Sequence, residues 1–279
     1  MRVTAAETKY KPHLKFIVRG PVTYIPGRKL RRKRAADTEE KKKHASIRAD
    51  IDLEKLESAY QALEESTRHL RESHIELILN FALAAEYKDP DTGNHILRIS
   101  DYSSELGRAV GLPEEELELL RYASPMHDIG KIGIPDNILQ KPGKLTPEEW
   151  VIMKQHTLIG SRIFKNSASP LLKAVSVISL THHERYDGTG YPHGLKGKDI
   201  PLYGRIVALV DVFDAMVSKR CYKSAVSFEE GFNYIRSLAG THLDPDLVEA
   251  FIRVKDRVQK IYEANRSIQR YIEEFGEKV

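Results

Sequence analysis

Several separate segments of the sequence carry histidine or aspartate side chains of the types that bind divalent transition metals. They are His95; the adjacent pair His127 and Asp128; His156; the adjacent pair His182 and His183; and Asp211. A lone histidine on an apolar helix face is more often a core or surface residue than a ligand. Asp211, however, lies in the apolar stretch RIVALVDVFDAM, where a buried carboxylate is costly unless it is paired. A shared metal site removes that cost and explains why acids and histidines occur together.

The segments that carry these residues have the pattern of amphipathic helices, because their apolar residues recur at the helical period. Two of them begin with a proline followed by glutamates, which suits the first turn of a helix. The run VSVISL resembles a strand, but the alternation that a half-buried sheet requires is nowhere sustained. We therefore predict an all-α fold with helices over residues 95–110, 113–128, 147–164, 171–184 and 205–219.

The adjacent histidines at positions 182 and 183 end one of these expected helices. Neighbouring helical residues diverge by about 100°, because a turn contains about 3.6 residues. We therefore expect the two imidazole rings to approach different sides of a metal cluster or different ions.

The order of these residues, H…HD…D, resembles the HD superfamily of metal-dependent phosphohydrolases. The longer strings HDIGKIGIPDNIL, HHERYDGTGYP and RIVALVDVFDAM resemble its HD-GYP subfamily, over residues from about Leu77 to Phe251. The resemblance implies an HD-type helical bundle. It also implies a bacterial phosphodiesterase that hydrolyses cyclic di-GMP to linear pGpG, and in many cases to GMP, through a metal-bridging hydroxide.

The metal ligands can be assigned by the same resemblance, which implies a centre of two or three divalent ions, most often iron or manganese. Four residues match the core HD ligands, with Asp128 as the carboxylate that bridges the ions: His95, His127, Asp128 and Asp211. Three more match the additional ligands of a multinuclear site: His156, His182 and His183. Asp214 is expected to orient a ligand rather than to bind metal itself.

Substrate contacts are also implied by the resemblance. Lys131 matches a lysine that contacts phosphate and would act with Asp128 in catalysis, while Arg220 and Lys223 match contacts to the substrate phosphates. These cations suit a reaction in which negative charge develops on the phosphate oxygens. Gly190, Tyr191 and Pro192 match the loop that borders the substrate cleft, and Tyr191 and Tyr222 would either stack on guanine or pack internally.

The sequence departs from the family pattern at three positions. Asp91 stands where the family often has a glutamate that helps to hold a third metal. Its shorter side chain makes two ions, or a weakly held third, an equal alternative to a full three-metal site. Cys221 stands where proline is usual, which loosens the local backbone. Pro125 precedes His127 and Asp128 and is expected to kink the helix that ends there.

Two other functions compete with hydrolysis of cyclic di-GMP. The first is an HD phosphohydrolase that acts on another nucleotide, such as a different cyclic one; the GYP string argues against it. The second is a non-catalytic receptor for cyclic di-GMP, although a receptor has no evident need for so complete a ligand set. Product analysis with metal-loaded protein distinguishes the three.

The N-terminal third of the chain carries a different pattern. Residues 50–88 contain a heptad repeat of apolar residues, which predicts a long helix that pairs with a second copy in a homodimer or packs on its own domain. Residues 1–49 are unassigned and include a charged block at 28–45, read as a solvated linker or a patch for anionic lipid or nucleic acid. The heptad helix would couple an unidentified sensory partner to the catalytic domain, residues 89–279 with a C-terminal helix.

Composition limits the remaining possibilities. Of the 279 residues, 41% are hydrophobic and 30% are charged, which suits a globular protein rich in exposed helix. The formal net charge of +4 is concentrated near the N-terminus, so nucleic-acid binding by the whole chain is not expected. No apolar run is long enough for a membrane span, and Cys221 is the only cysteine, so we expect a reducing, cytoplasmic location.

Overall fold

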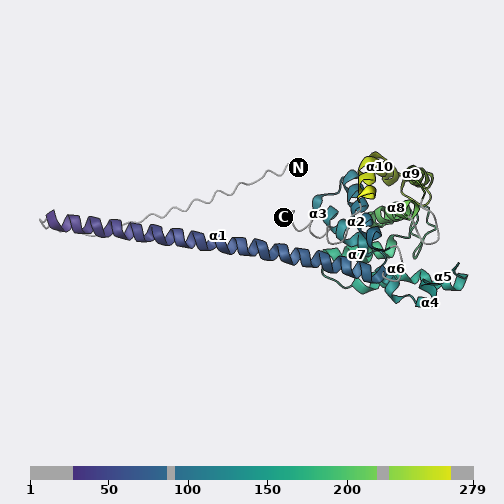
Figure 1. Ribbon diagram of the computed structural model, residues 1–279, viewed down its shortest axis with the longest axis horizontal. Coiled ribbons are helices and arrows are strands. Elements are labelled where there is room, and N and C mark those ends of the chain that lie inside the picture. The colour runs from purple at the N-terminus through teal and green to yellow at the C-terminus, as the bar shows by residue number, and fades with distance from the viewer. Residues whose placement is uncertain (1–27, 87–91, 219–225, 265–279) are drawn as a thin grey trace, which may run out of the picture. The chain divides into compact units, whose positions relative to one another are not determined.

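The computed structural model describes residues 28–86, 92–218 and 226–264, which divide between two units, Met1–Ala62 and Leu63–Val279 (Figure 1). Within these ranges the chain is built from helices and contains no β-strand, which confirms the predicted all-α fold. The α-helices are α1 Arg28–Glu86, α2 Thr92–Ala109, α3 Glu114–Ala123, α4 Asp136–Leu139, α5 Pro147–Met153, α6 Gln155–Phe164, α7 Pro170–Thr181, α8 Leu202–Val217, α9 Phe228–Ser237, α10 Pro245–Arg253 and α11 Lys255–Glu263. Short 3₁₀ turns occur at η1 Ser124–Met126, η2 Ile129–Gly133 and η3 Gly197–Asp199.

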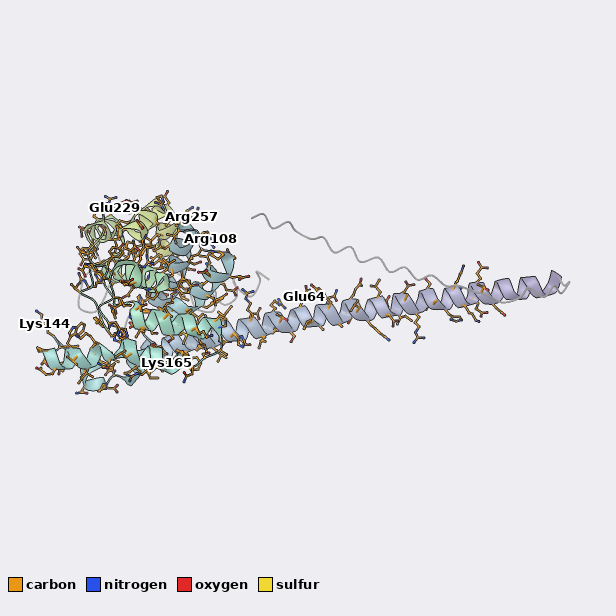
Figure 2. All side chains as sticks on the ribbon, turned by 180° about the vertical axis from the view of Figure 1, so that it is seen from behind. Glu64, Arg108, Lys144, Lys165, Glu229 and Arg257 are labelled. Carbon is orange, nitrogen blue, oxygen red and sulfur yellow. The ribbon has the colours of Figure 1, made fainter. Side chains whose placement is uncertain are left out.

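The core of the second unit forms around α8. Its residue Phe213 is fully buried and meets Tyr102 of α2 and Phe251 of α10 edge to face, with ring centroids 5.7 and 5.1 Å apart. Such pairs add to the hydrophobic gain from burying the rings. Charged side chains such as Arg108 and Lys165 project outward instead (Figure 2). The packed core therefore holds α2, α7 and α8, the elements that carry several of the candidate ligands, in fixed positions.

Helix α1 begins at Arg28, well before the expected start at residue 50. The block at 28–45, read above as a linker, belongs to this helix. Its lysine, arginine, glutamate and alanine residues favour helix, and neither glycine nor proline interrupts residues 28–86. No helix in the described part of the chain is long and apolar enough to cross a membrane.

The part of α1 that lies in the second unit presents two apolar faces. Ile75, Leu79, Ala82 and Ala85 are buried in the core of that unit, as expected for a helix packed on its own domain. The heptad residues lie on the other face and stay exposed: Leu63 at 64%, Leu70 at 58%, Leu77 at 53% and Phe81 at 58%. One face thus anchors the helix, and the other remains available for a partner.

Three of the predicted helices end early or divide next to candidate ligands. Helix α3 stops at Ala123 rather than at residue 128, and the 3₁₀ turn η1 with Pro125 in its first turn leads to His127. The expected helix over 147–164 is two helices, α5 and α6, with Lys154 between them. Helix α7 ends at Thr181, so His182 caps the helix and His183 lies in the turn that follows.

Candidate metal centre

The structure brings the candidate ligands from five elements into two neighbouring groups. The first group contains Asp128, His156, His182 and His183, and the second contains His95, His127 and Asp211. Within each group one ligand atom from every residue lies within 4.8 Å of the others. Helix α2 supplies His95, the η1–η2 segment supplies His127 and Asp128, and α6, the end of α7 and α8 supply the rest.

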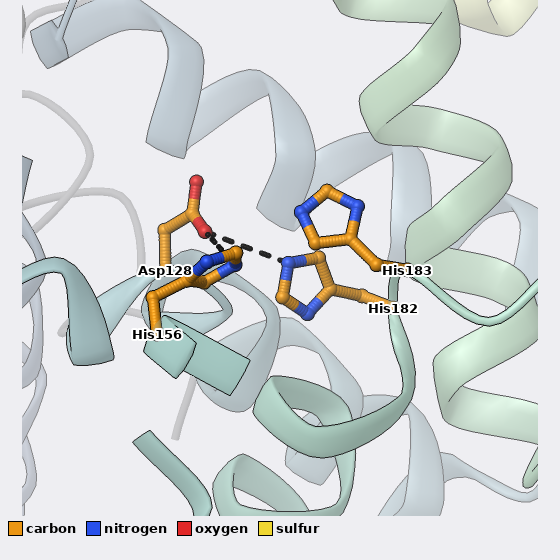
Figure 3. A group of neighbouring side chains, drawn as sticks. All are labelled: Asp128, His156, His182 and His183. Carbon is orange, nitrogen blue, oxygen red and sulfur yellow. Dashed lines mark ion pairs between the residues drawn. The ribbon is translucent and has the colours of Figure 1, made fainter. Parts of the chain in front are cut away.

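The first group has the spacing of ligands around a shared ion (Figure 3). Oδ1 of Asp128 lies 3.2 Å from Nε2 of His156 and 3.5 Å from Nε2 of His182. Ligand atoms bound about 2.0–2.2 Å from one metal lie about 3–3.5 Å from each other. Among the described residues these three buried atoms find no hydrogen-bond partner, an arrangement that is costly without an ion. The donor set therefore fits a divalent metal.

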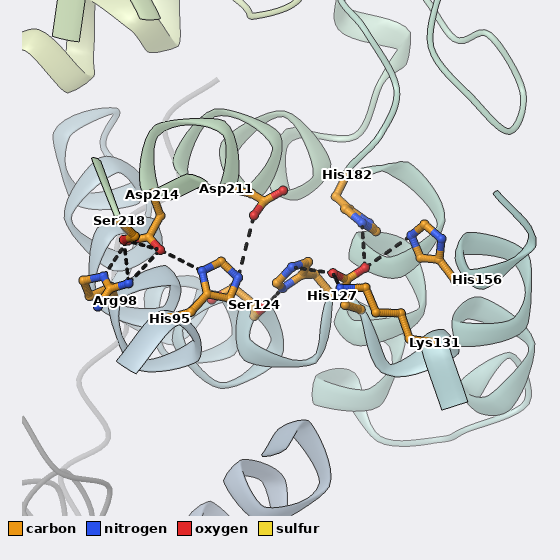
Figure 4. A network of polar contacts seen from close by, with 11 residues as sticks. His95, Arg98, Ser124, His127, Lys131, His156, His182, Asp211, Asp214 and Ser218 are labelled. Carbon is orange, nitrogen blue, oxygen red and sulfur yellow. Dashed lines mark hydrogen bonds and ion pairs between the residues drawn. The ribbon is translucent and has the colours of Figure 1, made fainter. Parts of the chain in front are cut away.

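The carboxylate of Asp128 joins the two groups, whose residues His95, His127, His156, His182 and Asp211 are labelled in Figure 4. Its Oδ1 faces His156 and His182, whereas its Oδ2 lies 3.3 Å from Nε2 of His127 and 2.8 Å from Nζ of Lys131. In the second group, Nε2 of His95 lies 3.7 Å from Oδ1 of Asp211. A carboxylate with one oxygen toward each group has the geometry to bridge two ions.

Hydrogen bonds at Nδ1 fix the histidine tautomers. Nδ1 of His127 lies 3.0 Å from the carbonyl of Ser124, and Nδ1 of His156 lies 2.8 Å from that of Met153. Nδ1 of His182 lies 3.0 Å from the carbonyl of Ile178. A carbonyl only accepts, so each Nδ1 must carry the proton and donate it. The Nε2 lone pairs are thus left for the centre, as metal-binding histidines require.

His95 is oriented by a carboxylate that is itself held by an arginine. Nδ1 of His95 donates to Oδ2 of Asp214 over 2.8 Å, so Asp214 orients a candidate ligand, the role that the sequence suggested for it. Arg98 donates to both oxygens of Asp214, from Nη2 over 2.9 Å, and also to Ser218. Our sequence interpretation missed Arg98; the available signal was a basic residue one turn after His95 in an amphipathic helix.

The charge states match this arrangement. Burial opposes ionisation of Asp128, but Lys131 and His127 outweigh it and hold the pKa of Asp128 well below its usual range. Burial lowers the pKa of His156 to about 4, against the opposing pull of Asp128. Burial also lowers the pKa of His183, and His182 adds to the shift. The carboxylate is therefore charged and these imidazoles neutral at neutral pH, which are the forms that bind metal.

The structure does not place His182 and His183 in different ligand groups, which was one of the two arrangements expected. Both belong to the first group, and their ring centroids lie 4.1 Å apart with the planes tilted by 42°. The expectation assumed that both residues continue the helix. Because α7 ends at Thr181, the turn after His182 brings the second ring back toward the first.

The turn that follows the histidines folds back over them. The Tyr191 ring stacks on His183 with centroids 4.8 Å apart and planes at 28°, and its backbone N–H donates to the His183 carbonyl. A Cβ at Gly190 would lie 2.2 Å from the Arg185 nitrogen, so only glycine allows this close approach. Buried Glu184 accepts backbone N–H groups of the same turn, 2.8 and 3.0 Å away. Pro192 follows Tyr191 through a cis peptide bond.

Some of the predicted site residues lie outside the described part of the chain. These are the possible third-metal ligand Asp91, the predicted phosphate contacts Arg220 and Lys223, and their neighbours Cys221 and Tyr222.

Gly130 packs closely against the backbone of His156, a member of the first group. A Cβ at Gly130 would lie 1.9 Å from the carbonyl oxygen of His156, which cannot move without shifting that ligand. We expect Gly130→Ala to lower the free energy of unfolding by about 1–3 kcal/mol and to reduce the metal content, as measured by urea denaturation and elemental analysis.

Gly133→Ala is the matched control, because its Cβ would meet only the flexible Ile159 side chain, at 3.0 Å. It should retain both stability and metal. Equal losses in the two variants would contradict a specific contact between Gly130 and the ligand helix α6.

The chain is similar in sequence to a known domain family and to several phosphodiesterases. Residues 57–247 match the HD domain family. A cyclic di-GMP phosphodiesterase from Thermotoga maritima is 50% identical over 185 residues, which cover 66% of this chain and 50% of that protein. A 3'3'-cGAMP-specific phosphodiesterase from Vibrio cholerae is 44% identical over 66% of this chain and 35% of its own length. The chain therefore spans half or less of these two curated relatives.

A solved structure shares the fold. It is the crystal structure of a cyclic GMP-AMP specific phosphodiesterase from Vibrio cholerae, with a TM-score of 0.50 and 20% sequence identity. The match covers 68% of this chain and 53% of that one. At this level of identity the likeness extends to the helical architecture alone.

Proposed function

Because the chain belongs to the HD domain family, as an HD-GYP domain protein, we propose that it is a metal-dependent phosphodiesterase that hydrolyses cyclic di-GMP. One observation carries the proposal: two groups of ligands share the carboxylate of Asp128, which has one oxygen toward each. The names of the relatives, which include cyclic di-GMP and cGAMP phosphodiesterases, support the choice of substrate class.

The two groups favour two divalent ions, one held by Asp128 with His156, His182 and His183, and the other by His95, His127 and Asp211. Histidine and carboxylate ligands suit iron or manganese. A third ion would require Asp91. When bound, a pair of ions would lower the pKa of a shared water and supply the attacking hydroxide for in-line displacement at phosphorus.

The chain itself contributes binding, orientation and charge. Lys131, beside Asp128, is positioned to stabilise negative charge that develops on a non-bridging phosphate oxygen. Arg220 and Lys223 would contact the substrate phosphates, and Gly190, Tyr191 and Pro192 would border the substrate. Cleavage of one diester bond yields linear pGpG, and cleavage of the second yields GMP.

The test is product analysis with the full chain. Protein purified without oxygen and loaded with iron or manganese is incubated with cyclic di-GMP, and with 3'3'-cGAMP in a parallel sample. We expect chromatography to resolve pGpG and then GMP. Faster turnover of cGAMP would identify the other cyclic nucleotide as substrate. Binding of cyclic di-GMP without any product would show a receptor and refute the proposal.

We further propose that two copies pair through α1. Its heptad residues are exposed in both units, including Leu56 at 66%, Tyr60 at 61% and Leu63 at 64%. Such a row of large apolar side chains is unfavourable in water and has the a/d spacing of a coiled coil. A second copy, with the same row, would cover it.

The pairing leads to a prediction. Leu56→Glu combined with Leu63→Glu should convert a dimer to a monomer in light scattering, because each buried leucine contributes about 1.5–3 kcal/mol. Ser58→Glu, on the opposite side of the heptad, should remain dimeric. A wild-type chain that is monomeric at all concentrations tested would refute the pairing.

A further inference from the structure

The only tryptophan of the chain lies at the edge of the candidate metal centre. Trp150 of α5 meets Tyr191 edge to face, with centroids 6.4 Å apart and planes at 76°. Tyr191 in turn stacks on the candidate ligand His183. A continuous row of rings thus leads from the first ligand group to the surface, where 47% of Trp150 remains exposed.

Helix α5 holds the indole in this position without burying it. Thr146 and Glu149 form a capping box at the start of the helix, and Lys141 donates to Glu149. No residue of α5 is buried, and α4 and α5 lie beyond α6 at one end of the unit (Figure 1). Trp150 is therefore not a core residue, and its exposure calls for another explanation.

The surroundings of Trp150 suit an anionic ligand that carries aromatic groups. Lys154, one helical turn further on, places Nζ 5.8 Å from the centroid of Tyr191. Lys131 adds a second cation beside Asp128. A cyclic dinucleotide carries two phosphates and two purine bases, so it presents both kinds of group together.

We propose that Trp150 is the platform on which one purine base of the cyclic dinucleotide stacks. This inference rests on the proposed function, since it assigns a base-binding subsite to the same centre. The ring of Tyr191 is less suited to stack on a base, because it stacks on His183 and meets Trp150 and His156 edge to face. The exposed ring next to it is the indole of Trp150. Stacking on an aromatic side chain accepts any base, because every base has a π face.

The kinetic test compares two substrates, cyclic di-GMP and the corresponding base-free diester, a cyclic di-ribose phosphate that contains no aromatic ring. In Trp150→Ala we expect kcat/KM for cyclic di-GMP, relative to the base-free diester, to fall about 5- to 150-fold, mainly through KM. Trp150→Phe should keep most of this preference because it retains an aromatic face. Val151→Ala, a neighbour that is 55% exposed, should behave as wild type.

Fluorescence provides a second readout, since all tryptophan emission comes from Trp150. Stopped-flow mixing of metal-loaded protein with cyclic di-GMP should quench this emission at concentrations near KM, and emission should recover as the substrate is consumed. Unchanged emission at saturating cyclic di-GMP would overturn the inference. So would an equal loss toward both substrates in Trp150→Ala, which would indicate a structural role or a protein partner on α5.

The two proposals fail in different ways. Wild-type protein that hydrolyses cyclic di-GMP without a change in emission refutes the base platform alone. Wild-type protein that quenches on binding but forms no product refutes the hydrolytic function while it supports the platform.

Discussion

Asp128→Asn is expected to abolish metal binding at both ligand groups and to lower phosphodiesterase kcat by at least about 10³-fold. Loss of one electrostatic partner in a preorganised site already lowers kcat about 10²- to 10³-fold. Because Asp128 faces both ligand groups, its replacement should lower kcat at least this much. Asparagine keeps the shape of the side chain, so the helical circular dichroism should be unchanged. Elemental analysis and the pGpG assay measure the two effects.

Asp246→Asn is the control for this substitution, because its side chain is 71% exposed and pairs only with exposed Lys198 in the described structure. It should keep full metal content and activity. An Asp128→Asn protein that retained its metal and a kcat within tenfold of wild type would show that the two groups do not depend on a shared carboxylate.

Helix content was readable from the sequence because apolar periodicity determines which face of each segment is buried. The ends of the helices were not. Pro125 and the separation of α5 from α6 at Lys154 are local features whose effect depends on how neighbouring elements pack. The start of α1 was also not predicted. We interpreted residues 28–45 as a linker because of their charge, although their composition favours a helix.

The types of residue in the site were predictable, but the way they group was not. His182 and His183 lie together because α7 stops one residue before them, a difference that periodicity cannot resolve. Arg98 and Asp214 lie 116 positions apart in the sequence, and the contact between them exists only once α2 packs on α8. Sequence motifs thus indicated the candidate ligands and Asp214, whereas the contact from Arg98 that holds Asp214 required the tertiary structure.

Removal of the Arg98 guanidinium is expected to destabilise the protein strongly. The side chain of Asp214 is 1% exposed, and that of Arg98 is 18% exposed. Burial works against the ionised carboxylate, but Arg98 and His95 outweigh it and lower the pKa of Asp214 to about 2. Arg98→Met would leave this charge buried without its main partner, at a cost of about 3–5 kcal/mol. Urea denaturation of the metal-free chain at pH 7 measures the loss.

Arg108→Met, in the same helix, is the matched control. Its guanidinium pairs with Glu105 but is 41% exposed, and exposed pairs contribute about 0–1 kcal/mol. The double variant Arg98→Met with Asp214→Asn should recover part of the stability lost in Arg98→Met, because asparagine carries no charge to leave unpaired. Two results would contradict this account: an equal loss of stability in the two arginine variants, or a double variant that is less stable than Arg98→Met. Either result would show that the pair with Arg98 does not hold Asp214, and therefore does not orient His95.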